Sequence, residues 1–424
     1  MGQAAGTLPR LRTNIAAMGL VQIGNYLIPL VTLPYLTRVL GAEAFGKVAF
    51  AQVVMAYFTL LVDYGFSWGA THQVATHRAD RTTISHIFAA TWAAQWLLVI
   101  LAALVATITV TAADRLRPDA MLYAAAFSSV IGSALFPMWF LQGLERLEVV
   151  AAIQLITRAV AIFPTFLFVR HPSDAVLLLL IYGFAGMLAG VLSLIWMHRQ
   201  SIVEWHWPRP NEMRNALRIS RGLFGSRLAL SLYTTLIPLI LGWVAGPVAL
   251  AYFNLADKLR SAAQSLLTPL SQAIFPRMIH LARTDGDAAF TLIKRSATAI
   301  ISIAVFASTA LWALPEWMVV LLGGVDFSPA AQVLRWLAPL PLVIGLSNIL
   351  GVQIMLPNGL HRAFNVTLFC SAVVSMILIW PMTRQNGAIG AAQTMLIVEV
   401  WVTSAMAVLL WHRGYLTAQR WRSN

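Results

Sequence analysis

The feature that most constrains this chain is a series of apolar runs that recur along its whole length. A membrane-spanning helix needs about 20 consecutive apolar residues. Hydrophobic residues make up 59% of the 424 residues and charged residues only 11%, and the mean hydropathy is +0.74. This composition excludes both a soluble surface and a disordered chain. The sequence therefore predicts an all-α membrane protein that crosses the bilayer many times.

The apolar runs predict twelve spans in two sets of six. The first set is placed at 13–36, 44–66, 83–111, 120–141, 150–169 and 175–197. The second set is placed at 214–243, 247–273, 290–322, 331–356, 361–381 and 388–411. The polar stretch between them contains Pro208 and Pro210, which favour a linker. We expect a lobe at 1–200, a cytoplasmic linker at 201–213 and a second lobe at 214–424, around a central cavity.

The distribution of basic residues predicts the orientation of the chain. Alternate loops carry 18 Lys and Arg on one side, Arg214, Arg218 and Arg221 among them, and 7 on the other. Since cytoplasmic loops carry the excess of Lys and Arg, both termini are expected in the cytoplasm, as an even number of spans requires. The first run is too long and too polar for a signal peptide and is interpreted as the first span. The remaining four basic residues fall inside spans: Arg158, Arg227, Lys258 and Arg260.

A faint repeat relates the two sets. The four residues 27–30 read Leu-Ile-Pro-Leu in the first span, and the same four letters recur at 236–239 in the seventh. A glycine follows each of them, Gly41 before Phe45 and Gly246 before Tyr252. Four matching letters in an apolar chain carry little weight alone, but a duplication would give two related lobes, which is a common plan among transporters.

The eighth span combines charged and polar residues on one side of the helix. At 100° per residue, its apolar residues share the opposite side. Because charges exposed to hydrocarbon are costly, the polar side should face other helices or a water-filled cavity; the alternative is a helix lying in the membrane interface. The polar side consists of Asn254, Asp257, Lys258, Arg260, Ser261, Gln264, Ser265, Thr268, Ser271 and Gln272.

Thinner polar stripes in other spans could line the same cavity, with Asn25 in the first, Gln52 and Asp63 in the second and Arg227 in the seventh. An Arg-rich cavity suits an anion, because guanidinium groups bind phosphate oxygens through paired N–H donors. The alternative for Arg158 and Arg227 is a local ion pair or a side chain that reaches the interface.

Three carboxylates in the spans have two interpretations. Asp63, Asp257 and Glu399 either neutralise a neighbouring Arg or, with a pKa raised by burial, carry a proton that couples transport to an ion gradient. The position of Asp63 near a predicted cytoplasmic helix end favours the first interpretation for that residue.

Catalysis is not expected. The nine His show no paired metal-binding spacing, and the sequence contains neither a nucleotide-binding glycine loop nor a nucleophile elbow. The single Cys370 excludes an internal disulfide and a cysteine metal site. No cofactor or metal is predicted, and the basic loops are explained by topology without nucleic acid.

Several motifs resemble one family. The run Pro34-Tyr35-Leu36-Thr37-Arg38-Val39-Leu40-Gly41, followed by Phe45-Gly46 and by Asp63-Tyr64-Gly65-Phe66, is similar to the opening of bacterial O-antigen and polysaccharide repeat-unit flippases. These form part of the multidrug, oligosaccharidyl-lipid and polysaccharide (MOP) flippase superfamily. Further similar stretches are Pro137 to Glu145, and Tyr252-Phe253 with Asp257-Lys258 leading to Phe275-Pro276-Arg277.

The resemblance implies a twelve-helix, two-lobed fold and a non-enzymatic flippase. The implied substrate is an undecaprenyl-diphosphate-linked oligosaccharide, moved from the cytoplasmic to the periplasmic leaflet of the inner membrane by alternating access. It also implies that basic residues bind the diphosphate and sugars, that H⁺ or Na⁺ drives transport, and that a polysaccharide polymerase and chain-length proteins are partners. We carry the binding role onto Arg227, Lys258, Arg260, Arg158 and Arg38; Arg38 could instead fix the turn at Gly41.

Two alternatives remain. A cation-coupled exporter of small molecules or drugs with the same fold would favour an acidic cavity, which the Arg-dominated stripes do not provide. A membrane polysaccharide polymerase or ligase would be expected to have a large extramembrane loop, whereas no loop here exceeds roughly 20 residues.

Overall fold

The computed structural model describes residues 7–204 and 206–415, and within this part the chain is helical and contains no strand. The structure describes only the backbone, and not the side chains, of the following helical residues: 7–30, 226, 227, 229, 230, 232–234, 269, 272, 273, 276, 280, 282 and 283. The chain divides into two units, Met1–Leu228 and Ala229–Asn424.

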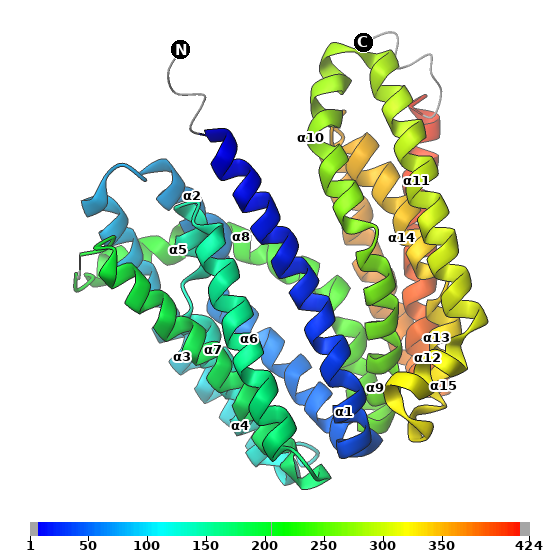
Figure 1. The fold of residues 1–424 in the computed structure, drawn as a ribbon, viewed down its shortest axis with the longest axis horizontal. Helices are drawn as coiled ribbons and strands as arrows, with labels where there is room; N and C mark the ends of the chain where they lie inside the picture. The colour runs from blue at the N-terminus through cyan, green and yellow to red at the C-terminus, as the bar shows by residue number, and fades with distance from the viewer. Residues whose placement is uncertain (1–6, 205, 416–424) are drawn as a thin grey trace. The chain divides into compact units, whose positions relative to one another are not determined.

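The first unit holds seven complete helices and most of an eighth (Figure 1). They are α1 (Thr7–Asp63), α2 (Phe66–Thr76), α3 (Arg81–Ala112), α4 (Ala120–Leu135), α5 (Met138–Gly143), α6 (Leu147–Phe168), α7 (Ala175–Arg199) and α8 (Pro210–Thr234). The second unit begins within α8. It continues with α9 (Leu236–Ser265), α10 (Thr268–Thr284), α11 (Gly286–Ala313), α12 (Pro315–Gly323), α13 (Ala330–Leu337), α14 (Leu340–Asn348), a π-helix (Ile349–Met355) and α15 (His361–His412).

The helices confirm the all-α membrane fold that the hydropathy pattern predicts. Among the described residues, nine helical segments are long and apolar enough to cross a membrane. A glycine with positive φ interrupts three of these helical segments, at Gly41 (φ 67°), Gly246 (φ 85°) and Gly387 (φ 54°). Because residues with a side chain are strained at such angles, glycine allows two helices to join through a single residue.

The glycines also support the repeat seen in the sequence. Gly41 and Gly246 both have ψ 178° with similar positive φ, and each lies between the first two spans of its set. A Cβ at either glycine would have no other atom within 4 Å. Backbone conformation, rather than lack of space, therefore explains glycine at both positions.

Small residues bring α4 and α7 together in the core of the first unit. A Cβ added at Gly132 would come within 2.9 Å of the carbonyl carbon of Gly186, and Gly183 packs against Ser128. Close backbone approach of this kind is a major source of helix association in membranes, where lipid weakens the hydrophobic drive. Nearby, the buried Trp139 donates from Nε1 to Oε1 of Gln95 at 3.1 Å.

The second unit has its own core, in which α10 and α11 pack with the π-helix and α15. Met278, Ile300, Ala304 and Met406 are fully or almost fully buried there. A polar contact is included, because Ser296 of α11 donates to Oε1 of Gln353 at 2.9 Å. This contact fixes the π-helix against α11.

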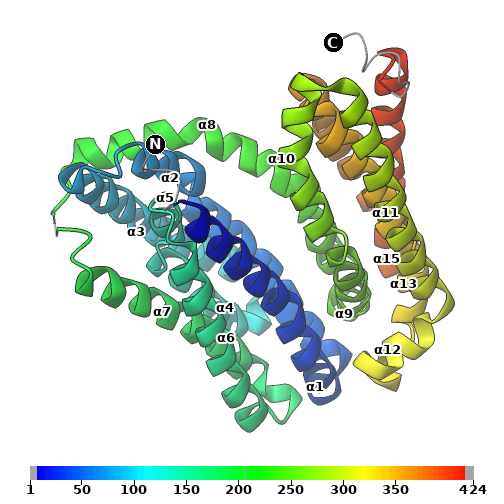
Figure 2. The same cartoon turned by 45° about the horizontal axis from the view of Figure 1, so that its top comes forward.

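Several predicted spans are interrupted by breaks between helices in the structure. The span expected at 290–322 is divided at Leu314, because Pro315 begins the separate helix α12. The span expected at 214–243 is divided at Thr235, between α8 and α9. Helix α8 lies across the ends of α2 and α3 (Figure 2), with Ser220 against Gly69 and Glu212 against His86.

Candidate functional site

The first half of α8 carries three arginines on one side of the helix. Arg214, Arg218 and Arg221 stand at i, i+4 and i+7, a spacing that places their side chains along one stripe. All three are exposed. The acidic residue in the first turn of α8, Glu212, is bound to the backbone N–H of Arg209 at 2.8 Å. The stripe therefore keeps a net positive charge.

The Asp63-Tyr64-Gly65-Phe66 motif forms the turn between α1 and α2 beside this stripe. Tyr64 (φ 46°) and Gly65 (φ 79°) both have left-handed backbone angles. A Cβ at Gly65 would meet the backbone nitrogen of Phe224 at 2.9 Å, so only glycine allows α8 to pack this closely. The ring of Tyr64 then stacks on that of Phe224, with 4.8 Å between centroids.

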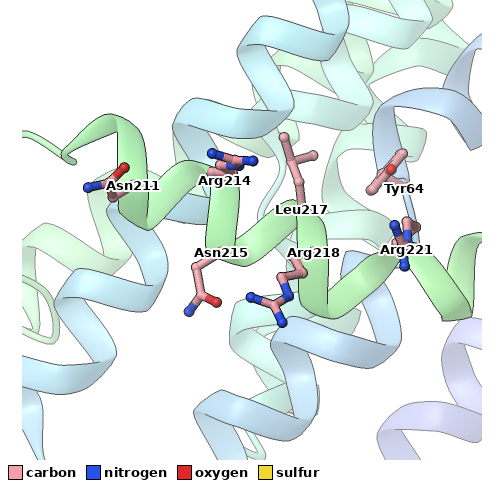
Figure 3. Close-up of a pocket in the computed structure, with 7 residues that line it drawn as sticks. All are labelled: Tyr64, Asn211, Arg214, Asn215, Leu217, Arg218 and Arg221. Carbon is pink, nitrogen blue, oxygen red and sulfur yellow. The ribbon is translucent and has the colours of Figure 1, made fainter.

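Tyr64 and the arginines line one cavity of about 710 Å³ in the first unit (Figure 3). This volume lies within the range of small-molecule sites, about 300–1,000 Å³. Its lining contains three guanidinium groups, two amides and a phenol, and no carboxylate. Such a set attracts anions, because Arg and amide N–H groups all donate hydrogen bonds to phosphate oxygens. The lining residues are Tyr64, Asn211, Arg214, Asn215, Leu217, Arg218 and Arg221.

Other arginines predicted on the same side of the membrane have acidic partners. Nη1 of Arg78 lies 2.8 Å from Oε2 of Glu145, and Nε of Arg81 lies 3.5 Å from Oε1 of Glu204. The guanidinium of Arg78 lowers the pKa of Glu145. Within the described part of the chain, none of the three α8 arginines has a carboxylate partner. They are therefore available to a ligand.

The polar side predicted for the eighth span forms the second half of α9. Arg260 is 8% exposed, and it donates to Asp257 at 2.7 Å and to Ser261 at 2.8 Å. Asp257 thus neutralises the charge of Arg260 across one turn of the helix. Lys258 is half-buried and has interactions of its own. The side chain of Asn254 is half-buried, and its Oδ1 has no hydrogen-bond partner.

A second, smaller cavity of about 320 Å³ lies in the second unit. It includes Thr268, Ser271 and Gln264 from the predicted polar side, together with Asn348 at the end of α14. The side-chain oxygens of Gln264 and Asn348 are buried without hydrogen-bond partners. The remaining lining is Leu267, Phe275, Ile300, Gly345 and Val352, so the cavity is mostly apolar and carries no charge.

The remaining predicted residues are spread over both units. Arg38 and Gln52 are exposed on α1, and Arg158 is half-buried on α6. Asp63 accepts a hydrogen bond from Ser67 at 3.0 Å, which ties the end of α1 to α2. Glu399 is half-buried on α15.

Two predicted residues, Arg227 and Asn25, have side chains outside the described part of the chain.

From the sequence alone, the charges of Arg214, Arg218 and Arg221 indicate the orientation of the chain and not a candidate binding site. A signal existed in their i, i+4, i+7 spacing, which the count of loop charges ignores. The contribution of Tyr64 could not be found in this way, because it depends on a contact with Phe224, 160 residues away along the chain.

The fold and the lining of the α8 cavity define a polytopic membrane protein with a positively charged cavity. Residues 11–282 match the family described as "Polysaccharide biosynthesis protein", and the chain belongs to this family. It is 32% identical to a protein of Escherichia coli (strain K12) named "Putative O-antigen transporter", over 94% of this chain and 96% of that protein. A Shigella dysenteriae protein of the same name is 28% identical over 93% of this chain and 99% of its own.

Solved structures share the fold, and one of them is described as a transporter of the MOP superfamily. The inward closed structure of the lipid II flippase MurJ matches with a TM-score of 0.72 and 11% identity, over 94% of this chain and 87% of MurJ. An inward-facing multidrug resistance MATE family transporter matches with a TM-score of 0.62 and 12% identity, over 97% and 99% of the two chains. At such identities the likeness establishes the fold alone.

Proposed function

We propose that the chain is a flippase that moves an undecaprenyl-diphosphate-linked oligosaccharide, an O-antigen or another polysaccharide repeat unit, from the cytoplasmic to the periplasmic leaflet. It acts as a transporter and not as an enzyme. The names of the two bacterial relatives and the family match support a role in polysaccharide export. The location is the bacterial inner membrane, with both termini in the cytoplasm.

The observation that carries the proposal is the cavity lined by Arg214, Arg218 and Arg221. A lipid-linked diphosphate is the anion such a cavity suits, because each guanidinium can bind two phosphate oxygens at once. The excess of basic residues supports a cytoplasmic position for this end of α8, on the side where the lipid-linked unit is made available. The cavity thus serves as the site at which the diphosphate enters.

The basic residues predicted inside spans have different roles in this proposal. Lys258, Arg227 and Arg158 contact the substrate after entry, and Arg38 does so at the opposite end of the first span. Arg260 is bound by Asp257, so it contributes hydrogen bonds from a neutralised pair rather than a free charge. Asn25, Gln52, Asn254, Ser261 and Gln264 supply polar contacts along the path.

Alternating access driven by H⁺ or Na⁺ completes the proposal. The partners of Asp63 and Asp257, Ser67 and Arg260, favour a structural or charge-balancing role for these two carboxylates. Asp63, Asp257 and Glu399 together are the candidates for coupling to an ion or for charge balance. A polysaccharide polymerase and chain-length proteins would receive the translocated unit.

The test removes the positive charge of the cavity. The double substitution Arg218→Ala and Arg221→Ala is introduced in a host that lacks the chromosomal copy of this protein. Surface polysaccharide is expected to fall at least ten-fold, with lipid-linked repeat units accumulating on the cytoplasmic leaflet and an unchanged amount of protein in the membrane. The matched control is Arg199→Ala, an exposed arginine at the end of α7 outside the cavity, which should retain wild-type export. Full export by the double variant would overturn the assignment of this cavity.

A second candidate is an exporter of small molecules, supported by the fold shared with a multidrug transporter. Such an exporter of cationic drugs would need carboxylates in its cavity, and the lining of the α8 cavity contains none. Drug susceptibility that rises on deletion, with surface polysaccharide intact, would favour this candidate.

A further inference from the structure

A cluster of two histidines and a glutamate joins three segments of the first unit. His86 lies near the start of α3, His206 in the linker and Glu212 in the first turn of α8. Nδ1 of His86 is 3.2 Å from Oε1 of Glu212, and Nε2 of His206 is 3.2 Å from Oε2. One carboxylate therefore faces two imidazoles.

The spacing of these atoms fits a tetrahedral metal ion. For metal–ligand bonds of about 2.0–2.1 Å, neighbouring ligand atoms in a tetrahedral site are about 3.3 Å apart. One ligand atom from each of the three side chains lies within 4.8 Å of the other two. Nδ1 of His86 is 3.2 Å from Oε1 of Glu212 and Nε2 of His206 is 3.2 Å from Oε2, so small side-chain rotations would bring the ligand atoms to this spacing. We propose that His86, His206 and Glu212 bind a divalent transition metal ion of the Zn²⁺ type, with solvent as the fourth ligand.

The chemistry of the three side chains suits a metal ion. Imidazole nitrogen and carboxylate oxygen are both common ligands of Zn²⁺. The imidazole rings of His86 and His206 are 4.0 Å apart between centroids, and each ring reaches an oxygen of the same carboxylate.

The cluster is also held in place before any metal binds. The backbone N–H of Glu204 donates to Oγ of Ser85 at 2.9 Å, which fastens the linker to the start of α3. The capping contact from Arg209 fixes Glu212 at the start of α8. All three side chains are half-buried, with between 29% and 44% of their surface exposed, so an ion and a water molecule can enter.

The ligand types predict which metals bind. Imidazole nitrogen and carboxylate oxygen favour Zn²⁺ and its neighbours, whereas Mg²⁺ and Ca²⁺ prefer sets made of oxygen alone. Two nitrogen ligands out of three therefore favour Zn²⁺ over Mg²⁺ or Ca²⁺. A bound ion would clamp the linker and α3 to the helix that carries the α8 arginines.

The experiment measures metal binding by the full-length protein. The chain is purified in detergent with an affinity tag that lacks histidine, treated with EDTA and titrated with Co²⁺, whose visible absorption reports coordination by nitrogen and oxygen. One equivalent of Co²⁺ should bind, and Zn²⁺ but not Mg²⁺ should displace it. His86→Ala, His206→Ala and Glu212→Gln should each weaken binding at least ten-fold.

The matched control is His198→Ala, which removes an exposed histidine at the end of α7 and should leave the titration unchanged. Elution at the wild-type volume in size-exclusion chromatography shows that a variant has folded, and His206→Gln, which keeps the side-chain volume, replaces any variant that fails this criterion. Absence of a stoichiometric Co²⁺ signal in the wild-type protein would overturn the proposal. So would equal loss of binding in His198→Ala and His206→Ala. Neither result depends on transport, so the proposed function is tested separately.

Discussion

Whether an arginine on α8 or α9 is buried or exposed depends on the residue one helical turn away. Arg260 has Asp257 three positions earlier and is buried as half of an ion pair with a separation of 2.7 Å. On α8, Arg214, Arg218 and Arg221 have only asparagine, leucine and one another on the same side, and they stay exposed around a cavity. Burial of a charge requires a partner, whereas an unpaired charge remains in contact with water. The α8 arginines are therefore the better ligands for an anion.

Gly65 is the residue on which the shape of the α8 cavity depends most directly. Gly65→Ala would place a Cβ at a φ of 79° and within 2.9 Å of the backbone of Phe224. We expect the substitution to destabilise the protein by about 1–3 kcal/mol, because left-handed strain and a backbone clash act together. The fall in unfolding temperature is measured by intrinsic fluorescence of the protein in detergent.

Gly222→Ala provides the matched control, since a Cβ there has no other atom within 4 Å and the residue lies in a helix. Alanine should stabilise α8 by up to about 1 kcal/mol through its higher helix propensity. If Gly65→Ala unfolds at the same temperature as the wild type, α8 does not pack against the turn between α1 and α2 as described.

At the scale of helices, the approach of α4 and α7 offers a sharp comparison within one contact. A Cβ at Gly132 would lie 2.9 Å from the Gly186 backbone, whereas a Cβ at Gly186 would lie 3.5 Å from Gly132. Gly132→Ala should therefore separate the helices and destabilise the protein by about 1–3 kcal/mol, while Gly186→Ala should change stability little. Thermal unfolding of the two variants in the same detergent gives the difference. Equal unfolding temperatures would contradict the packing.

The helices themselves follow from the sequence to a large extent. Apolar runs of span length, together with Gly41 and Gly246 at the turns, predict twelve spans, and the glycine angles explain why two spans can read as one continuous helix. The break at Thr235 could not be predicted, because hydropathy continues across it. The cluster of His86, His206 and Glu212 could not be predicted for another reason. Glu212 lies 126 positions after His86 along the chain, so no local spacing indicates the cluster.

For the whole molecule, the fold is shared by transporters of different substrates and does not by itself determine which substrate is moved. A lipid II flippase and a multidrug transporter both share it with this chain at 11–12% identity. What separates these activities is the chemistry of the path, because the same helices can present carboxylates to a cation or guanidinium groups to a diphosphate. The α8 cavity presents guanidinium groups, and its use for lipid-linked substrates requires that it open on the cytoplasmic side.

Orientation in the membrane is therefore the property on which the direction of transport depends. With 18 basic residues on one side and 7 on the other, the linker is expected in the cytoplasm and the turn between α6 and α7 in the periplasm. Single cysteines at two exposed positions, Gln200→Cys beside the linker and Ser173→Cys in that turn, are placed in a Cys370→Ser background. In intact spheroplasts, a membrane-impermeant maleimide should label position 173 and leave position 200 unlabelled until the membrane is permeabilised. Labelling of position 200 alone would place the α8 arginines on the periplasmic side, where they could bind the diphosphate only after it had crossed the membrane.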